Sequence, residues 1–586
     1  MGNFREVHDD PAGPECLERI REMIRFCEAV HQDCKTQSSR SLPRRVLEIT
    51  AGLQEAMTVR LYVSKDGEES DYLALSHCWG DAQPLTTTIR TLEKRRQGIE
   101  WADLPPTFQD ALRMTQALGK RFLWIDSLCI LQDDHDDWVT ESMKMGDIYQ
   151  NAYLTLAASA SPSAAGGMLV KRTSHLSKEF AVEGFSDTSS TKFKVREALG
   201  KHHRHDIPGM IRDSWRSDLI QPAWPMDALE TRAWTFQERL VSRRLLSFRG
   251  KEVEWDCRGC CDCECGARYR CFWVDGWNLR MASSRQTYQA MVTMAEFFSS
   301  KNAPSQLAKW RDRVYEEWFF SVVATYTQLR LTKESDRLPA LSAIAKQLEI
   351  ALNDSYVCGL WRQRLADGMT WRSGAFGTNP PTPGRLTKSY RAPSWSWASI
   401  EGPVDTCYDR EAVYEPIFHV ELTDVVPATS NRYGDVASAS ARVVGHMVPA
   451  TLSCSQGDDG KLKYSISIKD AAKTARRFWP DTRLSLRDGT LQRSEEVADI
   501  SPISSAPVQC LAALMSRIRN PKDILKPPQD ETVDFDAPRE LTFIVVTPSK
   551  RQQGAYERIG LLKHCLTVDM PVSWHVTWPA VPVEMV

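Results

Sequence analysis

The chain of 586 residues lacks the features that mark several large classes of protein. It has no uninterrupted apolar run of about 18 residues, the length that a membrane-spanning helix needs. Gly and Pro number only 30 and 31, which excludes collagen-like and low-complexity chains. The 74 basic and 76 acidic residues nearly cancel, so no excess positive charge draws the chain to nucleic acid. The remaining composition, 42% hydrophobic and 26% charged, is typical of a soluble globular protein.

Short catalytic motifs are missing as well. The sequence contains no G-x-x-x-x-G-K-[ST], no G-x-G-x-x-G, no H-E-x-x-H and no G-x-S-x-G. P-loop nucleotidases, Rossmann dehydrogenases, zincins and serine hydrolases with a nucleophile elbow are therefore without support. Residues 1–6 show no apolar signal-peptide core, so we expect a cytoplasmic protein whose 16 cysteines are reduced.

Strand and helix patterns alternate between residues 72 and 160. Apolar strands are predicted at 72–76, 122–125 and 153–157, and helices lie between them. The first helix, 107–118, is expected to begin with a capping box formed by Thr107 and Asp110. This order predicts an α/β fold, a parallel sheet with helices on both faces. The regions that follow are predicted to be mainly helical and then rich in β-strands.

Polar residues follow two of these strands, where open α/β sheets bind their ligands. They are Ser76 after the first strand, and Asp126 with Ser127 after the second. On the helix after Asp126, at about 100° per residue, Glu141 falls within the apolar stripe. A carboxylate there must be paired, hydrogen-bonded or protonated, which makes it a candidate functional acid. A structural ion pair with an Arg or Lys of a neighbouring element is the alternative, and the sequence leaves both open.

Three long motifs resemble those of fungal heterokaryon incompatibility (HET) domains. They are YLALSHCWG at 72–80, a longer motif at 122–149 that begins FLWIDSLCI, and RAWTFQE at 232–238. The segments LPRRV at 42–46, APSWSWA at 392–398 and YERIG at 556–560 are similar to flanking segments of full-length HET proteins. His77 departs from the family pattern, which more often has Tyr there.

The resemblance implies a fungal protein of non-self recognition and programmed cell death, with a TIR-like (flavodoxin-like) core. Some TIR domains hydrolyse NAD with the Glu of a W-x-x-E helix motif, and Trp138 and Glu141 have that spacing. The resemblance therefore implies Glu141 as the catalytic residue and NAD as a substrate. The other implied residues are ligand-binding: Ser76, Trp79, Gly80, Asp126, Ser127, Trp138, Arg232, Gln237 and Glu238.

Other functions remain open at this stage. The domain is alternatively a non-catalytic signalling or scaffold module, or an accessory or tailoring protein of a biosynthetic gene cluster. Expected partners are a second copy of the chain or an incompatibility partner protein, with no nucleic acid and no membrane span. We expect an N-terminal helical segment at 1–44, the HET domain at 45–250, a Cys-rich segment at 251–272, a mainly helical region at 273–399 and a β-rich region at 400–586.

Two groups of cysteines carry metal-binding spacing. Cys27, His31 and Cys34 lie one turn apart on a predicted helix, but three ligands leave a zinc site incomplete, so we favour half-buried helix residues. In the second group, Cys257, Cys260, Cys263 and Cys265 contain one C-x-x-C pair. These four could bind a structural zinc ion as a Cys₄ site. Zinc sites usually separate their two ligand pairs by a longer stretch, so we favour a loop of small residues there and keep the structural zinc as the alternative.

Overall fold

The computed structural model divides the chain into two compact units, Met1–Thr293 and Met294–Val586. It describes residues 5–35, 41–51, 57–80, 84–172, 177–183, 190–196, 227–266, 270–271, 285, 287–293, 304–374, 383–406, 412–456, 462–468, 476–487, 490–493, 504–518, 539–565 and 578–586. Within these residues, no helix is both long and apolar enough to pass through a bilayer.

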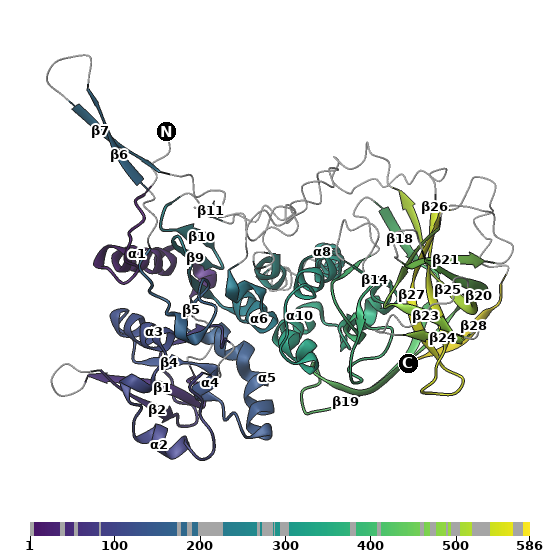
Figure 1. Ribbon diagram of the computed structural model, residues 1–586, viewed down its shortest axis with the longest axis horizontal. Coiled ribbons are helices and arrows are strands. Elements are labelled where there is room, and N and C mark those ends of the chain that lie inside the picture. The colour runs from purple at the N-terminus through teal and green to yellow at the C-terminus, as the bar shows by residue number, and fades with distance from the viewer. Residues whose placement is uncertain are drawn as a thin grey trace. The chain divides into compact units, whose positions relative to one another are not determined.

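The first unit is built on a nine-stranded sheet with the order β11-β10-β9-β8-β5-β3-β4-β1-β2 (Figure 1). Its strands are β1 (Arg45–Ala51), β2 (Met57–Val63), β3 (Tyr72–Ser76), β4 (Phe122–Trp124), β5 (Leu154–Ala157), β8 (Arg244–Phe248), β9 (Val253–Cys257), β10 (Cys260–Cys263) and β11 (Arg270–Cys271). A separate hairpin pairs β6 (Ser177–Glu183) with β7 (Ser190–Arg196).

The centre of this sheet is parallel. β3 pairs in parallel with β4 and β5, and β5 with β8, so the parallel strands lie in the order second, first, third, fourth along the chain. That is the order of doubly wound flavodoxin-like sheets. Antiparallel strands extend this parallel centre on both sides, and these additional strands were not predicted. The reason is local: β1 is joined to β2, and β8 to β9 and β10, by short connections, which permit only antiparallel pairing.

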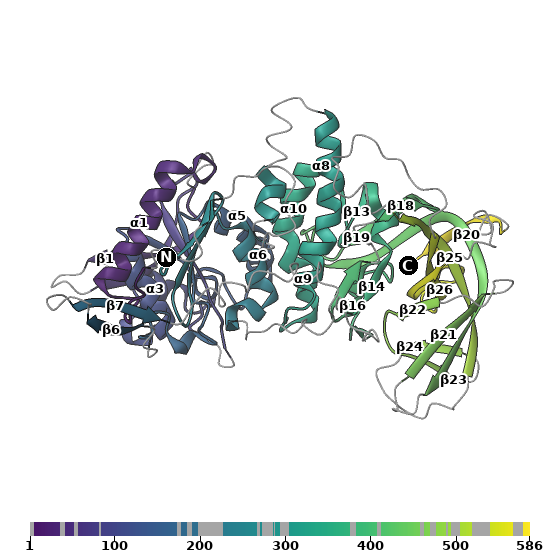
Figure 2. The ribbon, with the colours of Figure 1, turned by 90° about the horizontal axis from the view of Figure 1, so that it is seen from above.

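Helices cover both faces of the parallel centre, as predicted. α3 (Pro106–Ala117) connects β3 to β4, whereas α5 (His135–Asn151) and α6 (Ala233–Val241) lead back across to β5 and β8. Right-handed crossovers in opposite directions place α3 on one face and α5 with α6 on the other (Figure 2). α1 (Pro14–Val30) lies with α3, since Arg21 donates to the Ala117 carbonyl at 2.9 Å. The short helices α2 (Leu92–Gln97) and α4 (Asp126–Cys129) complete the unit.

The predicted capping box of α3 is absent. Pro105 is the N-cap and no side chain caps the helix. The Asp110 carboxylate instead accepts the backbone N–H groups of Met168 and Leu169 at 2.8 and 3.0 Å. The Thr107 hydroxyl donates to the Ser163 carbonyl at 3.4 Å. Both side chains therefore fasten the segment after β5 to α3, because long-range backbone donors compete with the local cap.

An ion-pair cluster fixes the N-terminal strand to α5. The guanidinium of Arg45 lies 2.5 Å from the Asp137 carboxylate and also donates to the Cys129 carbonyl at 2.6 Å. Arg44 reaches the same carboxylate at 3.0 Å, but its side chain is 56% exposed, against 3% for Arg45. The two neighbouring arginines thus make bonds of similar length in very different surroundings.

The second unit joins a helical part to a β-sheet. Its helices are α8 (Pro304–Glu317), a π-helical turn (Trp318–Val323), α9 (Ala324–Tyr326), α10 (Ser342–Leu352) and α11 (Leu365–Gly368). Short pairs are β12 (Tyr356–Val357) with β13 (Leu360–Trp361), β14 (Trp371–Ser373) with β17 (Val404–Thr406), β15 (Arg385–Leu386) with β16 (Ile400–Glu401), and β23 (Leu484–Arg487) with β24 (Thr490–Arg493). Trp395 and Trp397 of the second unit are fully buried.

The large sheet of this unit closes on itself. Its strands are β18 (Ala412–Pro416), β19 (His419–Pro427), β20 (Val436–Gln456), β21 (Leu462–Ile468), β22 (Arg476–Pro480), β25 (Ser504–Ile518), β26 (Arg539–Pro548), β27 (Tyr556–Cys565) and β28 (Ala580–Met585). β25, β26, β27, β28 and β20 pair in sequence, and β20 pairs again with β25. The ring surrounds apolar side chains such as Val448, Leu541 and Phe543, which are inaccessible to solvent.

Candidate functional site

The carboxyl ends of β3 and β4 bring together residues from all three motifs. Ser76 ends β3, and its hydroxyl donates to Glu238 Oε2 on α6 at 2.5 Å. β3 lies between β4 and β5, where the helices on either side run to opposite faces of the sheet. This is the topological switch point at which open α/β sheets bind ligands. The Ser76–Glu238 contact therefore lies at the place where the fold favours a site.

Glu238 is the buried acid of this cluster. Its residue is 4% exposed, and burial raises the pKa of its carboxyl to about 7. The nearby Asp126 carboxylate adds to the rise, whereas Ser76, Arg232 and the Tyr149 hydroxyl oppose it. A carboxyl group that titrates near neutral pH is suited to take up or release a proton under physiological conditions.

Asp126 is the second carboxylate of the cluster, and it is more accessible. Its Oδ2 accepts the indole N–H of Trp79 at 2.9 Å, and its Oδ1 accepts the backbone N–H of Ser127 at 2.7 Å. The side chain is 21% exposed, with His77 Nδ1 at 3.8 Å from Oδ1. These two donors fix the orientation of the Asp126 carboxylate at the rim. The cluster thus pairs a buried carboxyl with one that reaches solvent.

Two buried polar atoms beside Asp126 have no partner in the part of the chain that the structure describes. They are Nε2 of His77 and Oγ of Ser127. The His77 ring packs edge-on against Phe108, with ring centroids 5.0 Å apart, and burial lowers the pKa of the imidazole. A neutral imidazole and a hydroxyl buried without protein partners are costly unless something else satisfies them. Both therefore point to a bound molecule at this rim.

Contacts between α5 and α6 position the buried acid. Tyr149 of α5 donates its hydroxyl to the Leu75 carbonyl at 3.0 Å and also interacts with Glu238. Nearer the start of α5, Trp138 packs edge-on against Trp234 with centroids 6.4 Å apart. Trp138 is thus a packing residue between two helices in this structure.

The third motif surrounds Glu238 on its own helix. Arg232 is the N-cap of α6, and its charge acts on both Glu238 and the Cys78 thiol. Gln237 is buried, with 1% of its surface exposed. Arg232 therefore lies close enough to the cluster to bind an anionic group there.

Glu141 lies in the helix interior, as its position in the apolar stripe predicted. Its side chain is 2% exposed, and Oε1 pairs with the Lys144 ammonium at 3.1 Å. The partner is on the same helix, not on a neighbouring element as the ion-pair alternative assumed. Among the described residues, no hydrogen bond or ion pair joins Glu141 to Ser76, Asp126 or Glu238. Its backbone is displaced along α5 from Tyr149 by eight residues, about 12 Å of helix.

Gly80 has a structural reason to be glycine. Its φ is +85°, in the left-handed region, and a Cβ there would lie 2.4 Å from the Cβ of Ser163. The loop that follows β3 can pass this close to Ser163 only without a side chain. The motif glycine therefore shapes the rim, whether or not it contacts a ligand.

The Cys and His residues with metal-binding spacing separate into two groups in the structure. Cys257 approaches Cys27, His31 and Cys34, and the donor atoms of these four residues lie within 4.8 Å of one another. Cys263 and Cys265, with sulfurs 3.4 Å apart, lie instead with Glu252. Cys27, His31 and Cys34, interpreted from the sequence as half-buried helix residues, are buried, and a fourth potential ligand comes from a strand more than 200 positions later.

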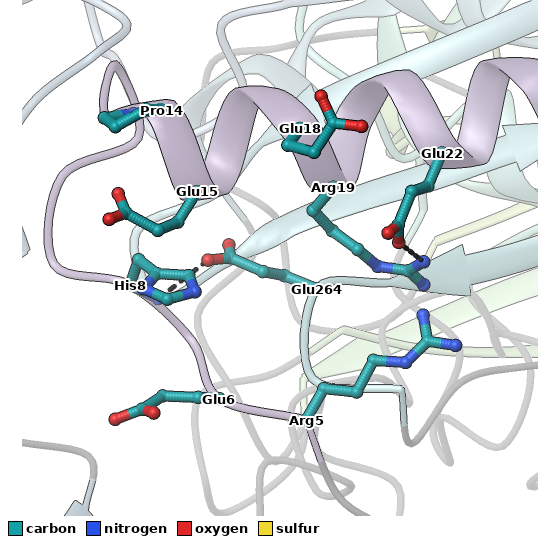
Figure 3. Close-up of a pocket in the computed structure, with 9 residues that line it drawn as sticks. All are labelled: Arg5, Glu6, His8, Pro14, Glu15, Glu18, Arg19, Glu22 and Glu264. Atoms are coloured by element: carbon teal, nitrogen blue, oxygen red, sulfur yellow. Dashed lines mark hydrogen bonds and ion pairs between the residues drawn. The ribbon is translucent and has the colours of Figure 1, made fainter.

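A separate hollow of about 490 Å³ lies between the N-terminal segment and α1 (Figure 3). Acidic and basic side chains line this hollow, and several of them have partners. The Glu264 carboxylate accepts the backbone N–H of His8 at 2.8 Å, and Arg19 pairs with Glu22 at 3.1 Å. None of its lining residues belongs to the ends of β3 or β4. It is therefore distinct from the Ser76–Glu238 cluster.

The sequence identified most members of the cluster but not its centre. Ser76, Trp79, Asp126, Arg232 and Glu238 were all predicted, yet the contact that unites them is between Ser76 and Glu238. Tyr149 was not predicted to reach the site. The sequence position of Tyr149 could have indicated this role. Tyr149 lies in the apolar stripe of α5, and a buried Tyr hydroxyl needs a hydrogen-bond partner.

Comparison with known proteins agrees with the motifs. Residues 72–238 match the family model described as heterokaryon incompatibility protein (HET). No curated protein and no solved structure gave a significant match. The match begins at the first residue of β3 and ends at Glu238, so it spans the whole cluster. Residues 72–238 of the chain therefore match a HET domain.

Proposed function

We propose that this HET-domain protein acts in a heterokaryon-incompatibility cell-death response by hydrolysing the bond between nicotinamide and ribose in NAD. The observation that carries the proposal is the Ser76–Glu238 contact at the switch point of the sheet, with Asp126 beside it. Paired carboxyl groups in different surroundings are the usual means of dividing acid–base and electrostatic roles in glycoside hydrolysis.

The reaction breaks one bond and forms one. The ribose–nitrogen bond breaks, its electron pair stays on the nicotinamide nitrogen, and the departing ring becomes neutral. Water adds to the anomeric carbon and loses a proton, giving ADP-ribose. The difficult moment is the positive charge that develops on the ribose as the ring departs. A nearby carboxylate stabilises that charge, and it does so more strongly where water is excluded.

Asp126 suits the electrostatic role, because its carboxylate is held by the Trp79 and Ser127 donors and remains partly exposed. Glu238 suits the proton-accepting role, because a base is most effective when its pKa lies near the working pH. Ser76, whose hydroxyl touches Glu238, would carry the proton from water to the buried carboxyl. Arg232 would bind the pyrophosphate.

Glu141 has a different part in this proposal. Its ion-pair partner is Lys144 on the same helix, and among the described residues no hydrogen bond or ion pair joins Glu141 to the cluster. We assign Glu141 to the support of α5, with its W-x-x-E spacing kept as the competing catalytic assignment. The two assignments differ in which carboxyl group the reaction needs, so they can be separated by substitution.

The test is NAD consumption by the purified full chain, followed by chromatography of nicotinamide and ADP-ribose. Glu238→Gln should lower the turnover number by about 100-fold or more, since it removes the general base. Glu141→Gln should retain most of the activity. Glu93→Gln, at an exposed position on α2, is the matched control for loss of one carboxylate.

Two results would contradict the proposal. Loss of activity in Glu141→Gln with retention in Glu238→Gln would move the catalytic role to Glu141. A folded wild-type chain that releases no nicotinamide, while its expression still kills cells, would favour the signalling or scaffold module. Toxicity that survives Glu238→Gln would lead to the same conclusion.

A further inference from the structure

Four potential metal ligands meet where the end of α1 approaches the edge of the sheet in the first unit. They are Cys27 on α1, His31 at its C-cap, Cys34 in the following 3-10 turn and Cys257 at the end of β9. All four are at least nine-tenths buried, and the sulfur and imidazole nitrogen atoms lie within 4.8 Å of one another. From this arrangement we infer that the protein binds one structural zinc ion through Cys27, His31, Cys34 and Cys257.

The donor set is one that zinc prefers. Three thiolates and one imidazole form a Cys₃His site, and structural zinc sites take four protein ligands in a tetrahedron. With Zn–S bonds of about 2.3 Å, donor atoms of a tetrahedron lie roughly 3.5–3.8 Å apart. Cys257 Sγ and His31 Nδ1 are 3.3 Å apart, and the other separations stay below 4.8 Å. Small shifts of side chains would therefore bring all four atoms to bonding distance.

Hydrogen-bond donors and a buried cation lie beside the sulfurs. Arg244 Nε donates to Cys27 Sγ at 3.4 Å, and the same guanidinium donates to the Cys34 carbonyl at 3.1 Å. The backbone N–H of Cys260 donates to Cys257 Sγ at 3.3 Å. Three thiolates and Zn²⁺ carry one net negative charge, which the buried Arg244 offsets. Donors of this kind orient ligands and tune metal affinity.

Gly259 makes room for the imidazole. A Cβ on this residue would lie 2.4 Å from His31 Cγ, so the turn between β9 and β10 can lie against the ring only with glycine at this position. This contact is independent of the sulfur atoms and fixes the place of the fourth ligand. It also offers a way to disturb the site without removing a ligand.

A zinc ion here would fasten the N-terminal helix to a strand that lies more than 200 positions later. Metal binding to such a site is coupled to folding, because the unfolded chain does not hold the four donors together. The site has no place in the proposed hydrolysis, since four protein ligands leave no position for a substrate. Its function would be to hold α1 against the domain that carries the Ser76–Glu238 cluster.

The experiment measures metal content by inductively coupled plasma mass spectrometry in the full chain, purified under reducing conditions. We expect about one zinc ion per wild-type chain. Cys27→Ser, Cys34→Ser and Cys257→Ser should each lose it. Cys16→Ser is the matched control, since Cys16 is a buried cysteine of the same helix outside the cluster.

Cys265→Ser tests the second group of cysteines, and it should keep the zinc. Gly259→Ala should release the metal to a chelator faster than wild type. Gly250→Ala, in the preceding turn, should not, because its new Cβ would meet nothing nearer than Ala160 Cβ at 4.0 Å.

Binding of Co²⁺ can be measured on the wild-type chain, so it tests the site even if the Cys→Ser variants fail to fold. The wild-type chain loaded with Co²⁺ should show thiolate-to-cobalt charge transfer and the visible bands of a tetrahedral site. Wild-type protein without stoichiometric zinc and without the cobalt spectrum would overturn the inference. So would zinc that persists in Cys257→Ser or disappears in Cys265→Ser, and so would iron in place of zinc.

Discussion

The raised pKa of Glu238 predicts a measurable dependence of stability on pH. Burial moves the pKa of this carboxyl from 4.5 to about 7 in the folded chain, while the unfolded chain keeps the ordinary value. Between these values the folded state retains a proton that the unfolded state has lost. The contribution of Glu238 to the free energy of unfolding is therefore fully present below pH 4.5 and is lost as the pH rises to about 7. At 1.36 kcal/mol per pKa unit, the loss is about 3 kcal/mol.

Glu238→Gln removes the titration while keeping a side chain that can accept the Ser76 hydroxyl. The difference in stability between variant and wild type should therefore shift in favour of the variant by about 3 kcal/mol between pH 5 and pH 8. Because the chain has two units, the suitable assay is hydrogen exchange by mass spectrometry on peptides from β3 and α6. Comparing both proteins at each pH cancels the intrinsic exchange rates.

The control is Glu93→Gln, which removes an exposed carboxylate outside the cluster. A constant difference for Glu238→Gln across the same range would refute the reasoning, since it would mean that Glu238 ionises alike in the folded and unfolded chains. A difference that shifts in favour of wild type would be a stronger refutation, as it would place a stabilising cation beside the carboxyl.

Two further predictions concern the frame of the site, each measured by thermal or urea unfolding of the first unit. Gly80→Ala should destabilise it by about 1–3 kcal/mol more than Gly67→Ala, because both glycines have positive φ but only Gly80 meets another side chain; equal losses would exclude the Ser163 contact. Arg45→Met should cost about 3 kcal/mol by leaving Asp137 buried with less compensation, whereas Arg44→Met should cost under about 1 kcal/mol. Similar costs for the two arginines would contradict the argument from burial.

The parallel centre of the first sheet was predictable because β3 and β4 are short, apolar and followed by helical patterns. The strand at 72–76 has the predicted bounds, and the helix predicted at 107–118 is shifted by one residue at each end. The antiparallel strands on either side were not predicted, since pairing partners depend on how short connections fold back. The capping box failed for a similar reason: Asp110 bonds to residues that lie more than 50 positions away.

In the candidate site, too, local patterns were predictable from the sequence and long-range contacts were not. Motif spacing identified which residues gather, and strand ends identified where. The sequence could not show that Glu238, and not Glu141, contacts Ser76, because that depends on how α5 and α6 pack. Nor could it join Cys257 to the three ligands around α1, since no local spacing connects them.

The 162 positions between Ser76 and Glu238 also set an order of events during synthesis. A nascent chain on the ribosome exposes the end of β3 long before α6 has been translated. Until α6 emerges and docks, Ser76 has no acid beneath it and the proposed chemistry has no base. Under the proposed mechanism, a chain truncated before Glu238 therefore lacks the base and should release no nicotinamide from NAD.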